Sequence, residues 1–134
     1  MTDSKDIVLL AARVLLATMF VASALDKFRL DPVDLRQIAS LHLPAPRMIE
    51  RLTGVFETVG AAALVFGIYA RVSAVALALF VAFVSLMFVR FWSFDGPPDV
   101  RAMLRNIFLA NVAVIGGLLY VAAFGAGRLA FADI

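Results

Sequence analysis

Long apolar runs separated by short polar segments form the main pattern of this chain. A helix that crosses the hydrocarbon core of a bilayer needs about 20 mostly apolar residues. Four runs come close to that length, and they cover residues 7–25, 48–69, 72–91 and 104–124. Because backbone N–H and C=O groups must be paired inside lipid, each run predicts a transmembrane helix.

The polar segments predict how these helices are connected. Only Ala70 and Arg71 separate the second run from the third, so these two helices are expected to be antiparallel neighbours. The segment between the first and second runs is longer and contains a possible amphipathic helix. The residues on its common face are Leu35, Ile38, Ala39 and His42. Because this helix is too short to cross a bilayer, we expect it to lie on the membrane surface.

The predicted fold is therefore all-α: an integral membrane bundle of four transmembrane helices with a short interfacial helix, in a single domain over residues 1–134. The composition agrees, because 63% of the residues are hydrophobic and only 16% are charged. A soluble domain has about 45–50% apolar and about 25% charged residues. The lipid bilayer is thus the first partner that the sequence predicts.

The composition also excludes several kinds of chemistry. The chain has no cysteine, which excludes disulfides, thiol redox chemistry and cysteine metal sites. It has one histidine, too few for a histidine-rich metal site. We therefore expect no metal site and no intrinsic cofactor. The net charge of +2, carried mostly in loops, does not indicate a nucleic-acid surface.

Basic residues are unequally divided between the two ends of the predicted bundle. With four spans, both termini lie on the same side of the membrane. The basic residues on that side are Lys5, Arg71 and Arg128. Those on the side of the two long loops are Lys27, Arg29, Arg36, Arg47, Arg51, Arg101 and Arg105. The positive-inside rule thus predicts cytoplasmic long loops and termini on the outside.

Three charged residues lie within or near the predicted spans: Arg13, Glu57 and Arg90. A charge at the centre of a membrane helix costs about 2.5–3.5 kcal/mol on insertion scales, so something must offset it. By helical rise, Glu57, Arg90 and Lys27 share a depth near the long loops, whereas Arg13 lies roughly 10 Å deeper. We therefore expect Glu57, Arg90 and Lys27 to form a polar cluster, with Arg13 deeper in the bundle.

The residues alone allow three interpretations of these charges. The cluster could form a pocket for a polar head group or a quinone. A pair such as Arg13 with Glu57 could instead only hold helices in register. Arg90 could also extend its side chain to the interface.

Other residues of the spans have simpler interpretations. The phenylalanines of the third span are most simply lipid-facing or packing surface, although a flat aromatic ligand could use them. These are Phe80, Phe83, Phe88 and Phe91. Five glycines are most simply positions of close helix packing. They are Gly54, Gly60, Gly67, Gly116 and Gly117.

Several motifs, in their order along the chain, resemble the DoxX family of small membrane proteins. The first span carries Arg13, Phe20 and Asp26-Lys27-Phe28, and the second carries Glu57, Gly60, Gly67 and Arg71. The aromatic pair Phe91-Trp92 closes the third span, and the run from Asn111 to Leu119 resembles the fourth. The tail from Gly125 to Asp133 resembles the glycine–arginine ending of the family.

This sequence departs from the family pattern at three places. Arg90 stands where the family often has a histidine before the aromatic pair, and Ala110 stands where a lysine often precedes the asparagine. Residues 130–132 are Ala-Phe-Ala where serine and leucine are usual. We expect Arg90 to supply the positive charge that the absent lysine would have given.

The resemblance implies a bacterial-type inner (plasma) membrane protein linked to quinone chemistry, since the family is named for a subunit of a thiosulfate:quinone oxidoreductase. The expected function is to bind a quinone or similar amphipathic ligand and to support a redox partner. Glu57 would accept a proton or a hydrogen bond, Arg13 and Arg90 would stabilise it or polarise a quinone carbonyl, and Lys27 and Asn111 would line the same cavity.

The resemblance does not establish catalysis, and an accessory subunit fits it equally well. The implied partners are a quinone or lipid ligand and either a redox subunit or further copies of the chain. Two alternative functions differ in kind from that of a quinone-binding subunit. One is a structural or assembly protein whose charges only fix helix packing. The other is a small-solute or lipid transporter, which the lack of internal repeats disfavours.

Overall fold

The computed structural model describes residues 4–29, 36 and 45–130, and these residues are almost entirely helical. The long helices are α1 (Ser4–Phe28), α3 (Pro46–Phe66), α4 (Ala70–Phe88) and α5 (Pro98–Phe124). A short 3₁₀ helix, η1 (Phe91–Ser93), follows α4. No strand occurs within these ranges, so the prediction of an all-α fold is confirmed. The predicted interfacial helix lies outside the described residues, apart from Arg36.

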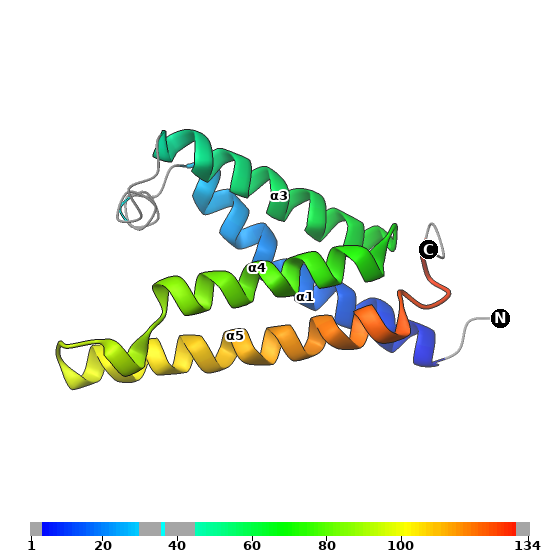
Figure 1. Ribbon diagram of the computed structural model, residues 1–134. Coiled ribbons are helices and arrows are strands. Elements are labelled where there is room, and N and C mark those ends of the chain that lie inside the picture. Colours follow the sequence, from blue (N-terminus) through cyan, green and yellow to red (C-terminus); the bar gives the residue numbers. More distant parts are fainter. Residues whose placement is uncertain (1–3, 30–35, 37–44, 131–134) are drawn as a thin grey trace.

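The helices are arranged as two close pairs. α1 packs mainly against α3, and α4 packs mainly against α5 (Figure 1). The short link from Gly67 to Tyr69 makes α3 and α4 antiparallel, as their near-contiguity in sequence predicts. The two helices lie close together at this link and diverge toward their other ends (Figure 1).

Three of the helical segments are long and apolar enough to cross a membrane: Ser4–Phe28, Ala70–Ser93 and Pro98–Phe124. The prediction of a helical multi-pass membrane protein is therefore supported. α3 has 21 residues but does not reach the same apolarity, because Glu50, Arg51 and Glu57 lie along it. The second predicted span, residues 48–69, is thus a helix, but its composition alone does not establish it as a span.

Small side chains allow the helices of the core to approach one another. Alanines recur at the buried positions, and a few larger apolar side chains fill the remaining space. The buried alanines include Ala17, Ala24, Ala61, Ala70, Ala74 and Ala78, and the larger residues include Phe20, Leu64, Leu77 and Leu118.

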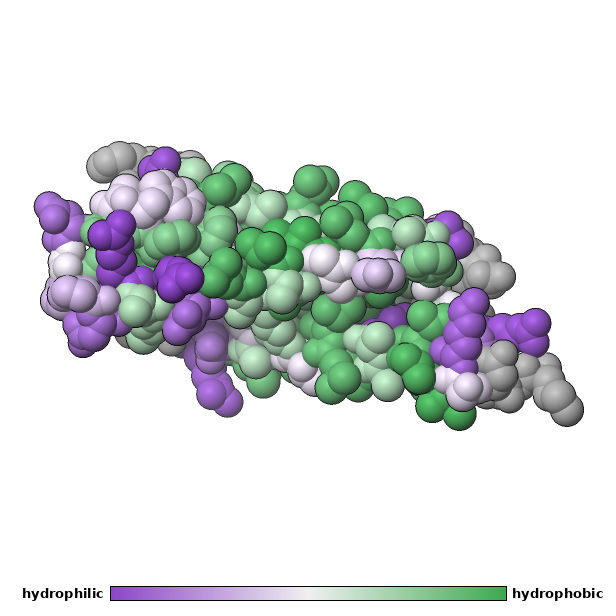
Figure 2. All heavy atoms as spheres, turned by 90° about the horizontal axis from the view of Figure 1, so that it is seen from below, coloured by the Kyte–Doolittle hydropathy of each residue, from purple (hydrophilic) through white to green (hydrophobic). Residues whose placement is uncertain are grey.

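The outer surface carries the features expected of a protein that has lipid as its solvent. Large apolar side chains are exposed along all four long helices, for example Leu15, Val59, Leu79 and Leu119. The face seen in Figure 2 carries a broad apolar region across its middle, with hydrophilic residues toward both ends. A water-soluble chain of this size would bury most of this surface.

Candidate functional site

An ion pair between α1 and α3 is the centre of the candidate site. Lys27 Nζ lies 2.8 Å from Glu57 Oε1, and the two side chains are 14% and 0% exposed. Gly54 lies one turn before Glu57, and a Cβ added there would lie only 3.3 Å from the Lys27 Cβ. The small residue therefore brings α1 near enough to α3 for the pair to form.

The ammonium group of Lys27 has two further neighbours. It donates a hydrogen bond of 2.7 Å to Ser23 Oγ, one turn earlier on α1. It also lies 6.0 Å from the centroid of the Phe80 ring on α4, within range of a cation–π interaction. Lys27 is thus held by groups from three helices.

Glu57 has far fewer partners than a buried carboxylate can accept. A carboxylate offers about four lone-pair positions. Apart from the Lys27 ion pair at Oε1, neither oxygen accepts a hydrogen bond from any described residue. Oε2 has no contact of either kind among those residues. Glu57 therefore keeps a capacity to accept a hydrogen bond from a further donor.

A cavity of about 200 Å³ adjoins this pair. Its wall combines charged and polar groups with aromatic and aliphatic side chains from all four long helices. The lining residues are Met19, Phe20, Ser23, Lys27, Glu57, Phe80, Val81, Val84 and Asn111. We call this space the head-group cavity. Asn111 Nδ2 donates a 2.9 Å hydrogen bond to Ser85 Oγ, which fixes the amide of α5 at the wall.

The structure thus brings together three of the site residues that the sequence predicts: Lys27, Glu57 and Asn111. Arg13 is placed elsewhere. It is only 1% exposed, and its guanidinium donates to the carbonyl oxygens of Leu64 at 2.8 Å and Val65 at 3.1 Å, and to that of Leu129. It contacts the last turn of α3 and not Glu57, so it lies outside the head-group cavity.

Arg90 also lies outside the cavity, and its side chain is exposed. α4 ends at Phe88, and Val89 and Arg90 have non-helical backbone angles. Arg90 therefore does not lie on the face of α4 that meets the other helices. Among the described residues the ion-pair partner of Glu57 is Lys27.

Sequence reasoning missed several residues of the cavity. Phe80 was interpreted as lipid-facing or packing surface that a flat aromatic ligand could use, but its position 6.0 Å from Lys27 Nζ was not foreseen. Ser23 and Ser85 each bond a predicted site residue. The spacing of four between Ser23 and Lys27 was a signal that could have identified Ser23, because such residues are neighbours on a helix.

Comparison with known proteins gives one match. The model of the DoxX family matches residues 8–90, which include the Lys27–Glu57 pair, Phe80 and Arg90. No curated protein and no solved structure matches the chain.

Proposed function

Because the match covers more than half of its length, the chain belongs to the DoxX family, and we propose that it binds the head group of a quinone or similar amphipathic ligand. The binding site is the head-group cavity. In this role the protein is a membrane subunit that supports a redox partner, and electrons pass between the quinone and that partner.

The incomplete bonding of Glu57 is the observation that carries this proposal. A carboxylate that is 0% exposed loses its hydration, and a single close cation offsets only part of that loss. A ligand that donates a hydrogen bond to Oε2 would supply the missing interaction. The reduced form of a quinone has such a hydroxyl donor.

The size and lining of the cavity support a ring as ligand. An apolar cavity of about 150 Å³ can hold a benzene molecule, and the head-group cavity measures about 200 Å³. Met19, Phe20 and Phe80 supply apolar surface for a flat ring. Lys27 is positioned to donate a hydrogen bond to a quinone carbonyl oxygen, and Asn111 offers an amide at the wall.

Substitution of the ion pair tests the proposal. The purified chain in lipid nanodiscs would be titrated with a dimethoxy-methyl-benzoquinone and with its reduced form, and binding would be followed by calorimetry. We expect Glu57→Gln to weaken binding of the reduced form about tenfold or more, because a hydrogen bond to a charged group contributes about 1.5–3 kcal/mol. Lys27→Met should weaken binding of the oxidised form by a similar factor. Unchanged affinities in both variants would contradict the proposal.

A second candidate function is favoured by the position of the ion pair between α1 and α3. In that interpretation the pair only fixes helix register. Replacement of Lys27 and Glu57 together by leucine distinguishes the two functions. A register role predicts that the wild-type chain binds neither quinone form and that the double variant folds normally. The proposed function predicts wild-type binding that the double variant loses.

A further inference from the structure

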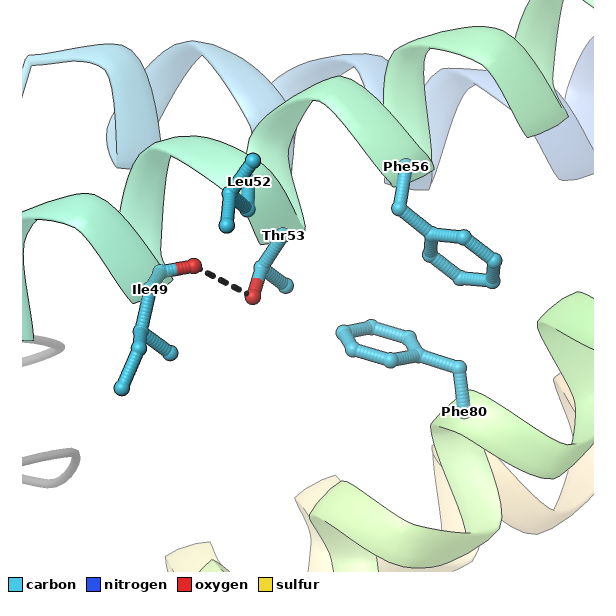
Figure 3. A pocket seen from close by; sticks show the side chains of 5 residues that line it. All are labelled: Ile49, Leu52, Thr53, Phe56 and Phe80. Carbon is cyan, nitrogen blue, oxygen red and sulfur yellow. Dashed lines mark hydrogen bonds between the residues drawn. The ribbon is translucent and has the colours of Figure 1, made fainter. Parts of the chain in front are cut away.

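A second hollow, of about 360 Å³, lies between α3 and α4 near the head-group cavity. Figure 3 shows the residues that line it: Ile49, Leu52, Thr53, Phe56 and Phe80. We call it the α3–α4 groove. Among the described residues that line it, the only side-chain polar group is the hydroxyl of Thr53, which donates a 2.8 Å hydrogen bond to the Ile49 carbonyl. The groove therefore offers apolar surface and no free side-chain donor.

Phe80 belongs to both the groove and the head-group cavity. Its ring centroid is 5.4 Å from that of Phe56, which lines the groove (Figure 3). The same ring is 6.0 Å from Lys27 Nζ, which lines the cavity. Phe80 therefore forms a wall that is shared by the apolar groove and the charged head-group cavity.

The groove reaches the lipid-facing surface of the molecule. Leu52 is 61% exposed and Phe56 is 39% exposed, so the α3 side of the groove is open. α3 and α4 diverge from their link toward this region (Figure 1). An apolar chain in the groove would thus continue directly into the acyl chains of the bilayer.

From this geometry we propose that the α3–α4 groove holds the apolar tail of the ligand whose ring occupies the head-group cavity. The ligand reaches the cavity sideways from the bilayer, between α3 and α4 and past Phe80. This inference rests on the proposed function, and it adds the class of ligand: a ring that carries a long hydrocarbon chain.

The groove provides the space that the tail must occupy more than it provides affinity. Hydrocarbon tails of lipids are as apolar as the groove, so a tail gains little free energy by leaving them. A blocked groove would nevertheless prevent a tailed molecule from placing its ring in the cavity. A ring without a tail has no need of the groove and would bind as before.

Two matched threonines on α3 allow a test of this difference. Thr53 lines the groove, whereas Thr58 is exposed and lines neither hollow. Each hydroxyl donates a 2.8 Å hydrogen bond to the carbonyl one turn earlier. Thr53→Phe therefore fills the groove, and Thr58→Phe makes the same chemical change on the lipid-facing surface. Ile49→Phe is a second groove-filling variant, should Thr53→Phe fold poorly.

Each variant in nanodiscs would be titrated with the dimethoxy-methyl-benzoquinone alone and with the same ring bearing a decyl chain. We expect Thr53→Phe or Ile49→Phe to weaken binding of the decyl compound at least tenfold and to leave binding of the bare ring within twofold. Thr58→Phe should change neither. Undiminished binding of the decyl compound in both groove variants would overturn the tail path but not the proposed function. Failure of the wild-type chain to bind either compound would overturn both.

Discussion

Arg13 is a buried arginine that hydrogen-bonds to the end of a helix and does not pair with a carboxylate among the described residues. The last carbonyl groups of an α-helix have no partner within the helix. Here the backbone N–H groups of Gly67 and Ile68 donate to Ala63, and Arg13 donates to the next two carbonyls, those of Leu64 and Val65. Arg13 therefore pairs backbone groups that would otherwise be buried and unbonded.

We expect Arg13→Met to lower the free energy of unfolding by about 1–3 kcal/mol, because it leaves two carbonyl groups of α3 without donors. Affinity for the benzoquinone ring should change less than twofold, since Arg13 does not line the head-group cavity. Thermal unfolding in detergent and ring titration would measure the two effects. Lys5→Met, on the exposed start of α1, is the control. A loss of ring affinity without a loss of stability would show that Arg13 acts in the site.

The sequence was informative about which residues share a depth, and less so about which way they face. Lys27 and Glu57 were predicted to meet because helical rise places them at one level, and the structure pairs them. Arg90 fits the same level, but α4 ends at Phe88. Apart from Arg90 itself, the residues remain apolar to Trp92, so the hydrophobic pattern could not reveal that the helix stops earlier. A buried arginine also does not reveal whether its partner is a carboxylate or a backbone carbonyl.

At the scale of helices, the apolar runs predicted the number and order of the long helices but set some boundaries wrongly. α5 begins at Pro98 and not near Leu104. Proline is favoured in the first turn of a helix, where its missing N–H costs nothing, so the helix extends into the polar loop.

The closeness of packing also differs among the five glycines. Gly54 lies against Lys27 and Phe28, whereas nothing lies within 4 Å of a Cβ at Gly116. Close packing, which the sequence predicted for both, therefore holds for Gly54 and is wrong for Gly116.

This contrast gives a matched pair of substitutions. We expect Gly54→Leu to force α1 away from α3, to separate Lys27 from Glu57 and to weaken ring binding at least tenfold. Gly116→Leu adds the same side chain in open space and should leave both stability and binding nearly unchanged. Thermal unfolding and ring titration would test both variants. Equal effects of the two substitutions would show that the approach of α1 to α3 at Gly54 is not what positions the pair.

At the scale of the whole molecule, an apolar middle and polar ends identify a membrane protein, but they do not fix its direction of insertion. The excess of basic residues at the long loops led us to propose that those loops are cytoplasmic. The sequence could not settle this point, because Lys27 is one of the basic residues counted and it serves the ion pair. A residue that serves a site is weak evidence for topology.

The absence of cysteine from the chain makes the orientation directly measurable. Ser93→Cys places a thiol at the loop end of the bundle, and Ser4→Cys places one at the terminal end; both positions are exposed. With a membrane-impermeant maleimide on intact cells, we expect Ser4→Cys to be labelled and Ser93→Cys to be protected until the membrane is opened. The reverse pattern would invert the proposed orientation.

The packing beneath Glu57 has a consequence for the direction in which protons move. Between this carboxylate and the terminal end lie Ala17, Ala61 and Leu64, all 2% exposed or less, and then Arg13 bonded across to Leu129. The fully buried side chains described between Glu57 and Arg13 are thus apolar and offer a proton no group to bind. On the proposed function, a proton that Glu57 exchanges with a quinone would therefore come from, and return to, the water on the long-loop side. Quinone chemistry at this site would acidify or alkalinise one compartment alone, and its contribution to the proton gradient would depend on the side from which the redox partner acts.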